Sequence, residues 1–225
     1  MTIVLTIVAL TLTAQVVLAA IVGWDKNTQA APDRGEFLWN NTYRVETLPD
    51  SGLAIRIHSN LGDPAAVSKY LELNKEQAQR LVSKDQGDWV FTTVTFASPL
   101  SWNEVTELRE GTGLVVDTYT FATLNRGGHK AIIGAVADGN SQVDFHKLRD
   151  IARQQGVEIK GVMLLQGKIR ARPEGLGRLL ADDRICIADV IAAEVLEAIA
   201  DQPEYQSASY IDVVVSSPFW DMKWD

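Results

Sequence analysis

The longest apolar run of the chain covers residues 1–24, which contain no charged side chain. About 22 helical residues span roughly 33 Å, enough to cross a hydrocarbon core of about 30 Å. Trp24 ends the run, where an indole favours the membrane interface, and Asp25 and Lys26 follow it. The pattern predicts an uncleaved, single-pass membrane anchor. The alternatives are a core helix and a signal peptide cut after Ala30, but signal peptides have shorter apolar segments that follow basic residues.

The orientation of this anchor is indicated only weakly by charge. Basic residues after the run, such as Lys26 and Arg34, stand beside acidic ones, so the asymmetry that orients a span is small. An N-terminal anchor that exports the rest of the chain is the commoner arrangement. We therefore expect a membrane protein, held in the bilayer by residues 1–24, with its globular part outside the cytoplasm.

Residues 25–62 are predicted to form a tether and a β-hairpin. The stretch 25–41 is polar and contains Pro32 and Gly35, as a tether does. Apolar and polar residues then alternate over 53–59, a strand pattern, and Pro-Asp-Ser-Gly at 49–52 is typical of a turn. The hairpin would pair this strand with 42–48.

Residues 63–225 are predicted to form one α+β domain with an aromatic C-terminal tail. Asp63-Pro64 begins a helix that extends to about residue 71. Three later pairs have the spacing of helix-capping residues, namely Asn74 with Gln77, Ser101 with Glu104 and Ser141 with Asp144. Strand-like segments rich in β-branched residues cover 89–97, 114–121, 131–137, 157–169, 185–188 and 210–215.

The order of these segments predicts a ferredoxin-like, split βαβ arrangement. One frame starts at residue 89 and uses 157–169 as its fourth strand. The other starts at Ala131 and splits 157–169, which is long for one strand, into a hairpin near Gly161 or Gly167. Both frames predict a single antiparallel sheet with helices on one face.

The segment GVMLLQGKIRARPEGLGRLLADDRICIAD resembles the second half of the propeptide or inhibitor module of subtilisin-like proteases. The likeness covers about residues 131–189 and consists of a strand with a small residue, a short helix near Pro-Glu, and Asp-Asp-Arg before a short strand. It implies a ferredoxin-like module whose C-terminal segment enters a protease active site. In this chain a further helix and strand follow that segment.

Composition excludes several classes of function. The chain has a formal net charge of −8 at pH 7, so a nucleic-acid partner is not expected, because phosphate recognition needs a basic surface. Cys186 is the only cysteine, which excludes an intrachain disulfide and a cysteine-based zinc site. No nucleotide-binding or nucleophile motif is present, and no cofactor or metal is expected.

Candidate catalytic residues are few and isolated. His58, His129 and His146 have no metal-ligand spacing, and we expect His58 and His146 to be solvated. His129 lies beside Arg126 and two glycines, which is either an anion nest or a hairpin tip. Cys186, between two isoleucines, is interpreted as a buried, unreactive thiol.

The C-terminal tail carries the clearest candidate site. Aromatic residues and a methionine gather over 218–225, and the predicted partner-binding residues are Phe219, Trp220, Met222 and Trp224. Packing of the tail on the chain's own sheet is the alternative.

We expect a non-enzymatic accessory subunit that binds another protein. The first alternative is a protease inhibitor, and the second is a secreted enzyme that acts through Cys186 or His129.

Overall fold

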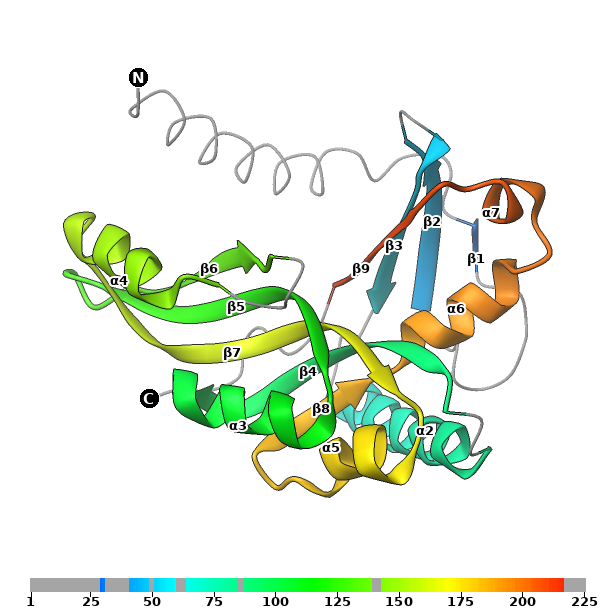
Figure 1. The fold of residues 1–225 in the computed structure, drawn as a ribbon, viewed down its shortest axis with the longest axis horizontal. Helices are drawn as coiled ribbons and strands as arrows, with labels where there is room; N and C mark the ends of the chain where they lie inside the picture. The colour runs from blue at the N-terminus through cyan, green and yellow to red at the C-terminus, as the bar shows by residue number, and fades with distance from the viewer. Residues whose placement is uncertain are drawn as a thin grey trace.

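The computed structural model describes residues 29–30, 41–48, 51–59, 64–84, 87–138 and 143–216, which form an α+β fold with two sheets (Figure 1). This confirms the predicted α+β class. The predicted anchor, residues 1–24, lies outside the described residues. Among the residues that are described, no helix combines the length and the apolar character needed to cross a membrane.

The larger sheet has five strands in the order β6-β5-β7-β4-β8, and all its neighbours are antiparallel. Its strands are β4 Trp89–Leu100, β5 Val115–Asn125, β6 Lys130–Val136, β7 Val157–Arg170 and β8 Ile185–Asp189. Helix α3 (Trp102–Thr112) connects β4 to β5, and α4 (Phe145–Gln154) connects β6 to β7. The turn η3 (Pro173–Gly177) and α5 (Arg178–Ala181) connect β7 to β8.

Strand β7 is one continuous strand of 14 residues. Of the two predicted frames, the one that splits 157–169 into a hairpin is therefore wrong. Its glycines do not form a turn. They allow the backbones of the neighbouring strands to approach the backbone of β7 closely. A Cβ at Gly161 would lie 2.6 Å from the carbonyl oxygen of Leu100, and one at Gly167 would overlap the carbonyl oxygen of Val115. Both neighbouring strands can therefore pack against β7.

The smaller sheet has the order β1-β2-β3-β9. Its strands are β1 Gln29–Ala30, β2 Asn41–Thr47, β3 Leu53–Ser59 and β9 Ile211–Ser216. Strands β2 and β3 form the expected antiparallel hairpin, and β3 also pairs in parallel with β9. The first and last strands of the described chain thus share a sheet, which the sequence pattern did not indicate.

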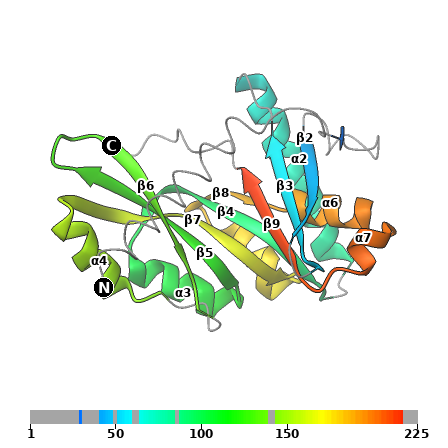
Figure 2. The same cartoon turned by 90° about the horizontal axis from the view of Figure 1, so that it is seen from above.

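Both faces of the larger sheet are covered, but the second face is covered by elements outside residues 89–189, to which the expectation of helices on one face applied. Helices α3 and α5 lie on one face, whereas α6 (Ile191–Ile199) and the smaller sheet lie on the other (Figures 1 and 2). Consecutive residues from Val162 to Leu165 are buried, as a strand covered on both faces requires. Gln166 of β7 donates a hydrogen bond of 3.2 Å to the carbonyl of Val215 in β9 and joins the two sheets.

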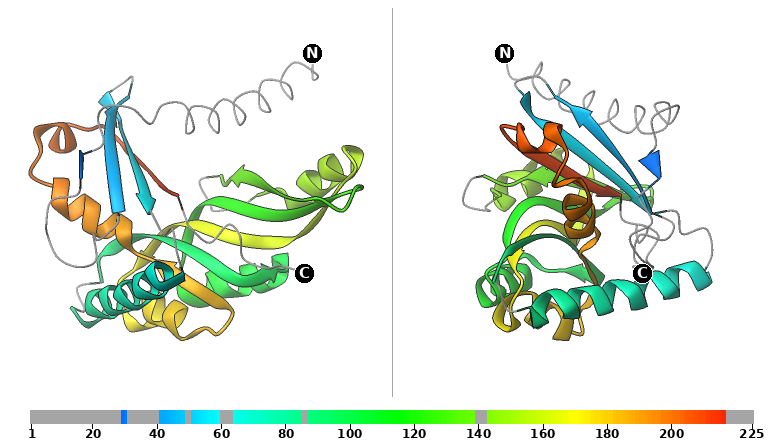
Figure 3. Two further views of the ribbon diagram at one scale, coloured as in Figure 1. Left: turned by 180° about the vertical axis from the view of Figure 1, so that it is seen from behind. Right: turned by 90° about the vertical axis from the view of Figure 1, so that its right-hand side faces the viewer.

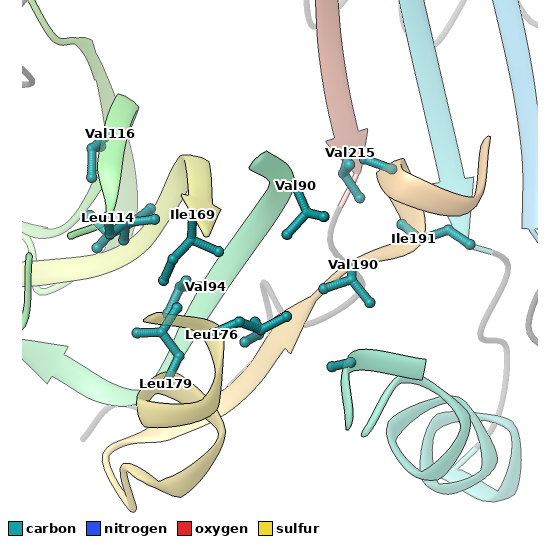
Figure 4. Packing of buried hydrophobic residues seen from close by; sticks show 14 of the residues in the cluster. Val90, Val94, Leu114, Val116, Ile169, Leu176, Leu179, Val190, Ile191 and Val215 are labelled. Carbon is teal, nitrogen blue, oxygen red and sulfur yellow. The ribbon is translucent and has the colours of Figure 1, made fainter. Parts of the chain in front are cut away.

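One hydrophobic core extends through these layers. Val94 of β4 lies near Leu176 and Leu179, and Val90 of β4 and Val215 of β9 belong to the same cluster (Figure 4). Under α3 and α4 the core is aromatic. The indole of Trp102 stacks on Phe145 with ring centroids 5.1 Å apart, and Tyr119 and Phe121 of β5 complete the cluster.

The cap of α3 matches the sequence signal. The Ser101 backbone N–H donates to Glu104 over 2.8 Å, the Glu104 N–H donates to the Ser101 hydroxyl, and Gly113 ends the helix with φ 70°. The start of α4 differs from the prediction, because the cap is Asp144, which accepts from the Lys147 N–H at 2.9 Å. The predicted cap residue Ser141 lies outside the described residues.

Helix α2 (Pro64–Ser83) is continuous over 20 residues, so the predicted break at Asn74 is wrong. Asn74 and Gln77 lie buried within it instead of capping a second helix. The helix packs against β8 and η3, and the two views of Figure 3 show it beside α5. The short α7 (Pro203–Gln206) follows α6 and leads to β9.

Candidate functional site

A cleft of about 400 Å³ lies where the end of α2, the start of β4 and helix α6 meet. Its walls combine aromatic, aliphatic and charged side chains from parts of the chain that are far apart in sequence. The residues used below are Lys84 of α2, Asp88, Trp89 and Phe91 at β4, Glu194 and Glu197 of α6, and Tyr205 of α7. Because these elements are fixed by the shared core, the cleft is a preformed feature of the fold.

The β4 wall of the cleft is aromatic. Trp89 and Phe91 alternate along β4 and point to the same face, and the register places Arg170 and Lys168 of β7 opposite them. The Arg170 guanidinium lies 4.3 Å from the Trp89 ring centroid, and the Lys168 ammonium lies 4.5 Å from that of Phe91. These cation–π contacts orient both rings, although Trp89 is still 46% exposed.

The α6 wall of the cleft is acidic. The side chain of Glu194 is 13% exposed, and one of its oxygens lies 3.5 Å from a guanidinium nitrogen of Arg80 on α2. Burial raises the pKa of Glu194 above its ordinary value, while Arg80 opposes that shift. Asp88, Glu194 and Glu197 give the lining three carboxylates, and Lys84 is the only lysine in the lining.

The chemistry of the cleft can be described from its lining. The lining contains no histidine, cysteine or serine, and its ionisable side chains are the three carboxylates, Lys84 and Tyr205. Within the described ranges, no group of three or more histidine, cysteine, aspartate or glutamate residues is arranged to hold a metal ion. An aromatic wall facing carboxylates suits an apolar ligand whose positive charge pairs with the carboxylates.

A buried polar group behind the cleft positions the helices that form it. Asp189, at the end of β8, accepts two hydrogen bonds. The Tyr70 hydroxyl of α2 donates one of 2.7 Å, and the N–H of Ile191, the first residue of α6, donates one of 2.9 Å. The carboxyl is fully buried, and desolvation raises its pKa to about 6, while its two donors oppose the shift. Asp189 therefore connects α2 to the start of α6.

Asn74 makes a second connection from α2 to β8. Its amide nitrogen donates to the Ala188 carbonyl and its amide oxygen accepts from the Val190 N–H, each over 2.9 Å. The Ala188 carbonyl and the Val190 N–H are the groups to which an additional strand would form hydrogen bonds at this edge of the sheet. One side chain thus closes the β8 edge and fixes α2 against it.

The residues that the sequence singled out lie elsewhere. The tail residues Phe219, Trp220, Met222 and Trp224 lie outside the described residues, as does the side chain of His58. His146 is exposed on α4. Cys186 is half-buried in β8, and burial raises its thiol pKa, which opposes thiolate formation.

The glycine turn before β6 is a hairpin tip and not an anion nest. The Asn125 side-chain oxygen accepts from the N–H groups of Gly127 and His129, each over 2.9 Å. The amides that would bind an anion are therefore engaged within the turn. The anion-nest alternative for His129 is not supported by this geometry.

The sequence analysis missed the cleft because its walls meet only in the tertiary structure. The available signals were local ones, namely Trp89 at the start of a strand and Glu194 within the apolar stretch of α6. Neither indicates by itself that the two residues are neighbours.

Comparisons of the chain with protein-family models, curated proteins and solved structures find no match. The resemblance of residues 131–189 to the propeptide module of subtilisin-like proteases therefore stays a prediction. Function has to be inferred from the cleft, the surface and the sequence outside the described residues.

Proposed function

We propose that this protein is a single-pass, membrane-anchored accessory subunit, without enzymatic activity, whose α+β domain lies outside the cytoplasm and binds another protein. The cleft between α2, β4 and α6 is the observation that carries the proposal, because its aromatic wall and its acidic wall together suit an apolar segment with a basic residue. The charge-free run 1–24 supports the membrane anchor.

The chemistry of the cleft selects the type of segment bound. Trp89 and Tyr205 provide rigid apolar area that loses little entropy when it is covered. Glu197 is exposed on α6 and adds negative charge at this site, within a chain whose net charge is −8. The partner therefore contributes an apolar segment with a lysine or arginine close to its apolar residues.

Site-specific photo-cross-linking of the full-length protein in its membrane tests this proposal. A photoreactive phenylalanine analogue at Ala200, which lines the cleft, should form one discrete adduct with a partner protein. The adduct should disappear when Glu197→Lys is added, because the reversed charge repels a basic segment. The control position is Glu107, exposed on α3, where neither the probe nor a lysine should have an effect.

Two results would contradict the proposal. One is an adduct pattern that is the same from positions 200 and 107, and the other is an adduct from position 200 that Glu197→Lys does not change. Thermal unfolding of each variant shows that the fold is intact, so that loss of the adduct reports on binding.

We infer that the larger sheet is an elaborated ferredoxin-like unit. Strands β4, β5, β7 and β8, taken as first to fourth, have the spatial order fourth-first-third-second. With α3 and α5 as connections, they match a split βαβ unit, to which β6 and α4 are added between β5 and β7.

The start of α6 favours the accessory-subunit proposal over a protease inhibitor. An inhibitor of the propeptide type presents an extended segment just after its last strand. Here α6 begins two residues after β8 ends, and Ile191, Val195 and Ile199 of α6 are buried in the core.

A further inference from the structure

An ion pair joins the acidic wall of the cleft to the end of α2. Arg80 lies in the last turn of α2, and a nitrogen of its guanidinium lies 3.5 Å from Oε1 of Glu194 on α6. The two partners differ in their surroundings, since the side chain of Arg80 is 63% exposed and that of Glu194 is 13% exposed. Glu194 lines the cleft, whereas Arg80 reaches it from outside the lining.

This pair leaves the carboxylate of Glu194 only partly compensated. A contact of 3.5 Å to a well-solvated guanidinium is weak, because water screens the charge of the exposed partner. Burial still raises the pKa of Glu194 above its ordinary value, while Arg80 and Lys84 lower that pKa and Glu197 raises it further. A desolvated cation inside the cleft would interact with Glu194 across a lower effective dielectric than Arg80 does.

Arg80 does not depend on Glu194 for a favourable environment. It lies in the last turn of a helix, where the helix dipole favours a cation, and most of its side chain is in contact with water. The guanidinium can therefore leave Glu194 for solvent at little cost in free energy. The pair is an exchangeable contact at the border of the cleft.

We propose that Arg80 is an internal competitor for Glu194, whose guanidinium occupies the position that the partner's lysine or arginine takes when the partner binds. The inference rests on the proposed function, because it needs a partner that brings a basic residue into the cleft. Arg80 lowers the affinity for that residue both by covering part of the carboxylate and by neutralising its charge. A segment without a basic residue cannot displace Arg80, so the pair also selects for basic segments.

A purely structural role for Arg80 predicts the opposite result. If the pair held α6 against α2, its removal would let the two walls move apart and would weaken binding. Other contacts already fix these helices, namely the hydrogen bonds that Asp189 accepts from Tyr70 and Ile191, and the burial of Val195 in the core. Removal of the Arg80 guanidinium should therefore leave the walls in place and strengthen binding.

Dilution of the full-length complex, solubilised at pH 8 to keep Glu194 ionised, measures this competition. The adduct formed by the photoreactive phenylalanine analogue at Ala200 is quantified at each dilution, and the concentration that halves its yield gives the apparent Kd. That concentration should fall roughly two- to fivefold for Arg80→Gln, the range expected for an exposed ion pair. Arg80→Met, which keeps the aliphatic part of the side chain, should give the same gain. Lys75→Gln removes the same charge from an exposed site on α2 and is the matched control.

A double variant tests whether Glu194 is the group for which Arg80 competes. Glu194→Gln alone should weaken binding, since the amide carries no charge to attract a cation. Adding Arg80→Gln to Glu194→Gln should change nothing further, because no competition remains.

The inference is overturned if Arg80→Gln weakens binding or leaves it unchanged, if Lys75→Gln strengthens binding equally, or if the gain persists with Glu194→Gln. An adduct that Glu197→Lys abolishes but Arg80→Gln does not strengthen contradicts this inference and leaves the proposed function standing. An adduct that is absent, or that Glu197→Lys does not change, contradicts both. Thermal unfolding of each variant shows that a change in binding does not come from loss of the fold.

Discussion

At the scale of single residues, Asp189 has the largest pKa shift among the described residues and should affect how stability depends on pH. Its carboxyl is fully buried, and its pKa is raised to about 6 by desolvation. The folded protein therefore binds a proton more tightly than the unfolded chain between about pH 4 and pH 6. The free energy of unfolding should be lowered as pH rises through that window, because a charged carboxylate must then stay buried.

Asp189→Asn tests this linkage, since the amide keeps an acceptor for the Ile191 N–H but carries no charge. We expect the variant to gain stability relative to the wild type between about pH 4 and pH 7, by an amount on the order of 3 kcal/mol. Urea unfolding across that range measures it. Glu194 and Asp117, whose pKa values are also raised by burial, are present in both proteins, so the difference isolates Asp189. Parallel pH profiles for the two proteins would show that Asp189 is not the cause.

Asn74 illustrates why a residue with a clear local signal can have a different role. Asn74 with Gln77 and Ser101 with Glu104 have the same spacing, yet only the second pair caps a helix. Ser101 is exposed, and its hydrogen bonds go to Glu104 of its own helix. Asn74 is buried, and it bonds β8, which is more than one hundred residues away in the sequence. The capping box could be predicted from the sequence because it is local, and the edge contact could not.

Asn74→Ala should destabilise the fold on the order of 3 kcal/mol, because the Ala188 carbonyl and the Val190 N–H would both be left buried without their partner. Lys75→Ala, at the next and exposed position of α2, should stay within about 0.5 kcal/mol of wild type. Both values come from urea unfolding. Equal effects of the two substitutions would mean that Asn74 does not hold α2 to the sheet edge.

At the scale of elements, the start of α4 depends on Asp144. Asp144→Ala should lower the free energy of unfolding by about 1 kcal/mol, because the Lys147 N–H loses its acceptor. His146→Ala, exposed in the first turn of the same helix, serves as the control and should change little. An effect no larger than that of the control would place the start of α4 elsewhere.

Element types were predictable wherever the pattern was local, and their arrangement was not. The β2–β3 hairpin, the capping box of α3 and the strand at β5 follow from alternation, turn residues and cap spacing. The parallel pairing of β3 with β9 joins residues 158 positions apart, such as Leu53 and Ile211, and no periodicity encodes it. Gly161 and Gly167 were read as turn residues because a glycine in a strand has two uses, and only the neighbouring backbones decide between them.

At the scale of the whole molecule, the sequence predicts an attachment at each end of the chain, to a membrane through residues 1–24 and to a partner through the aromatic tail. Residues 1–24 should remain in the mature protein, because the charge-free run is longer than the apolar part of a signal peptide. N-terminal sequencing of the protein purified from membranes measures this. A mature chain that starts near Ala31 would show that the segment is cleaved.

The aromatic tail is predicted to bind a protein partner and not the bilayer. Phe219, Trp220 and Trp224 carry large apolar area with few rotatable bonds, and Asp221 and Asp225 among them disfavour anionic lipid. Replacing Trp220 and Trp224 with alanine should weaken the complex by more than about 2 kcal/mol, the scale of interface hot spots. The unfolding temperature of the full-length protein should stay the same, because the indoles are expected to be buried only against the partner. Val115→Ala, at an exposed site on β5, is the control for both measurements. A double mutant that unfolds much earlier while keeping its partner would show that the tail packs on the protein's own sheets.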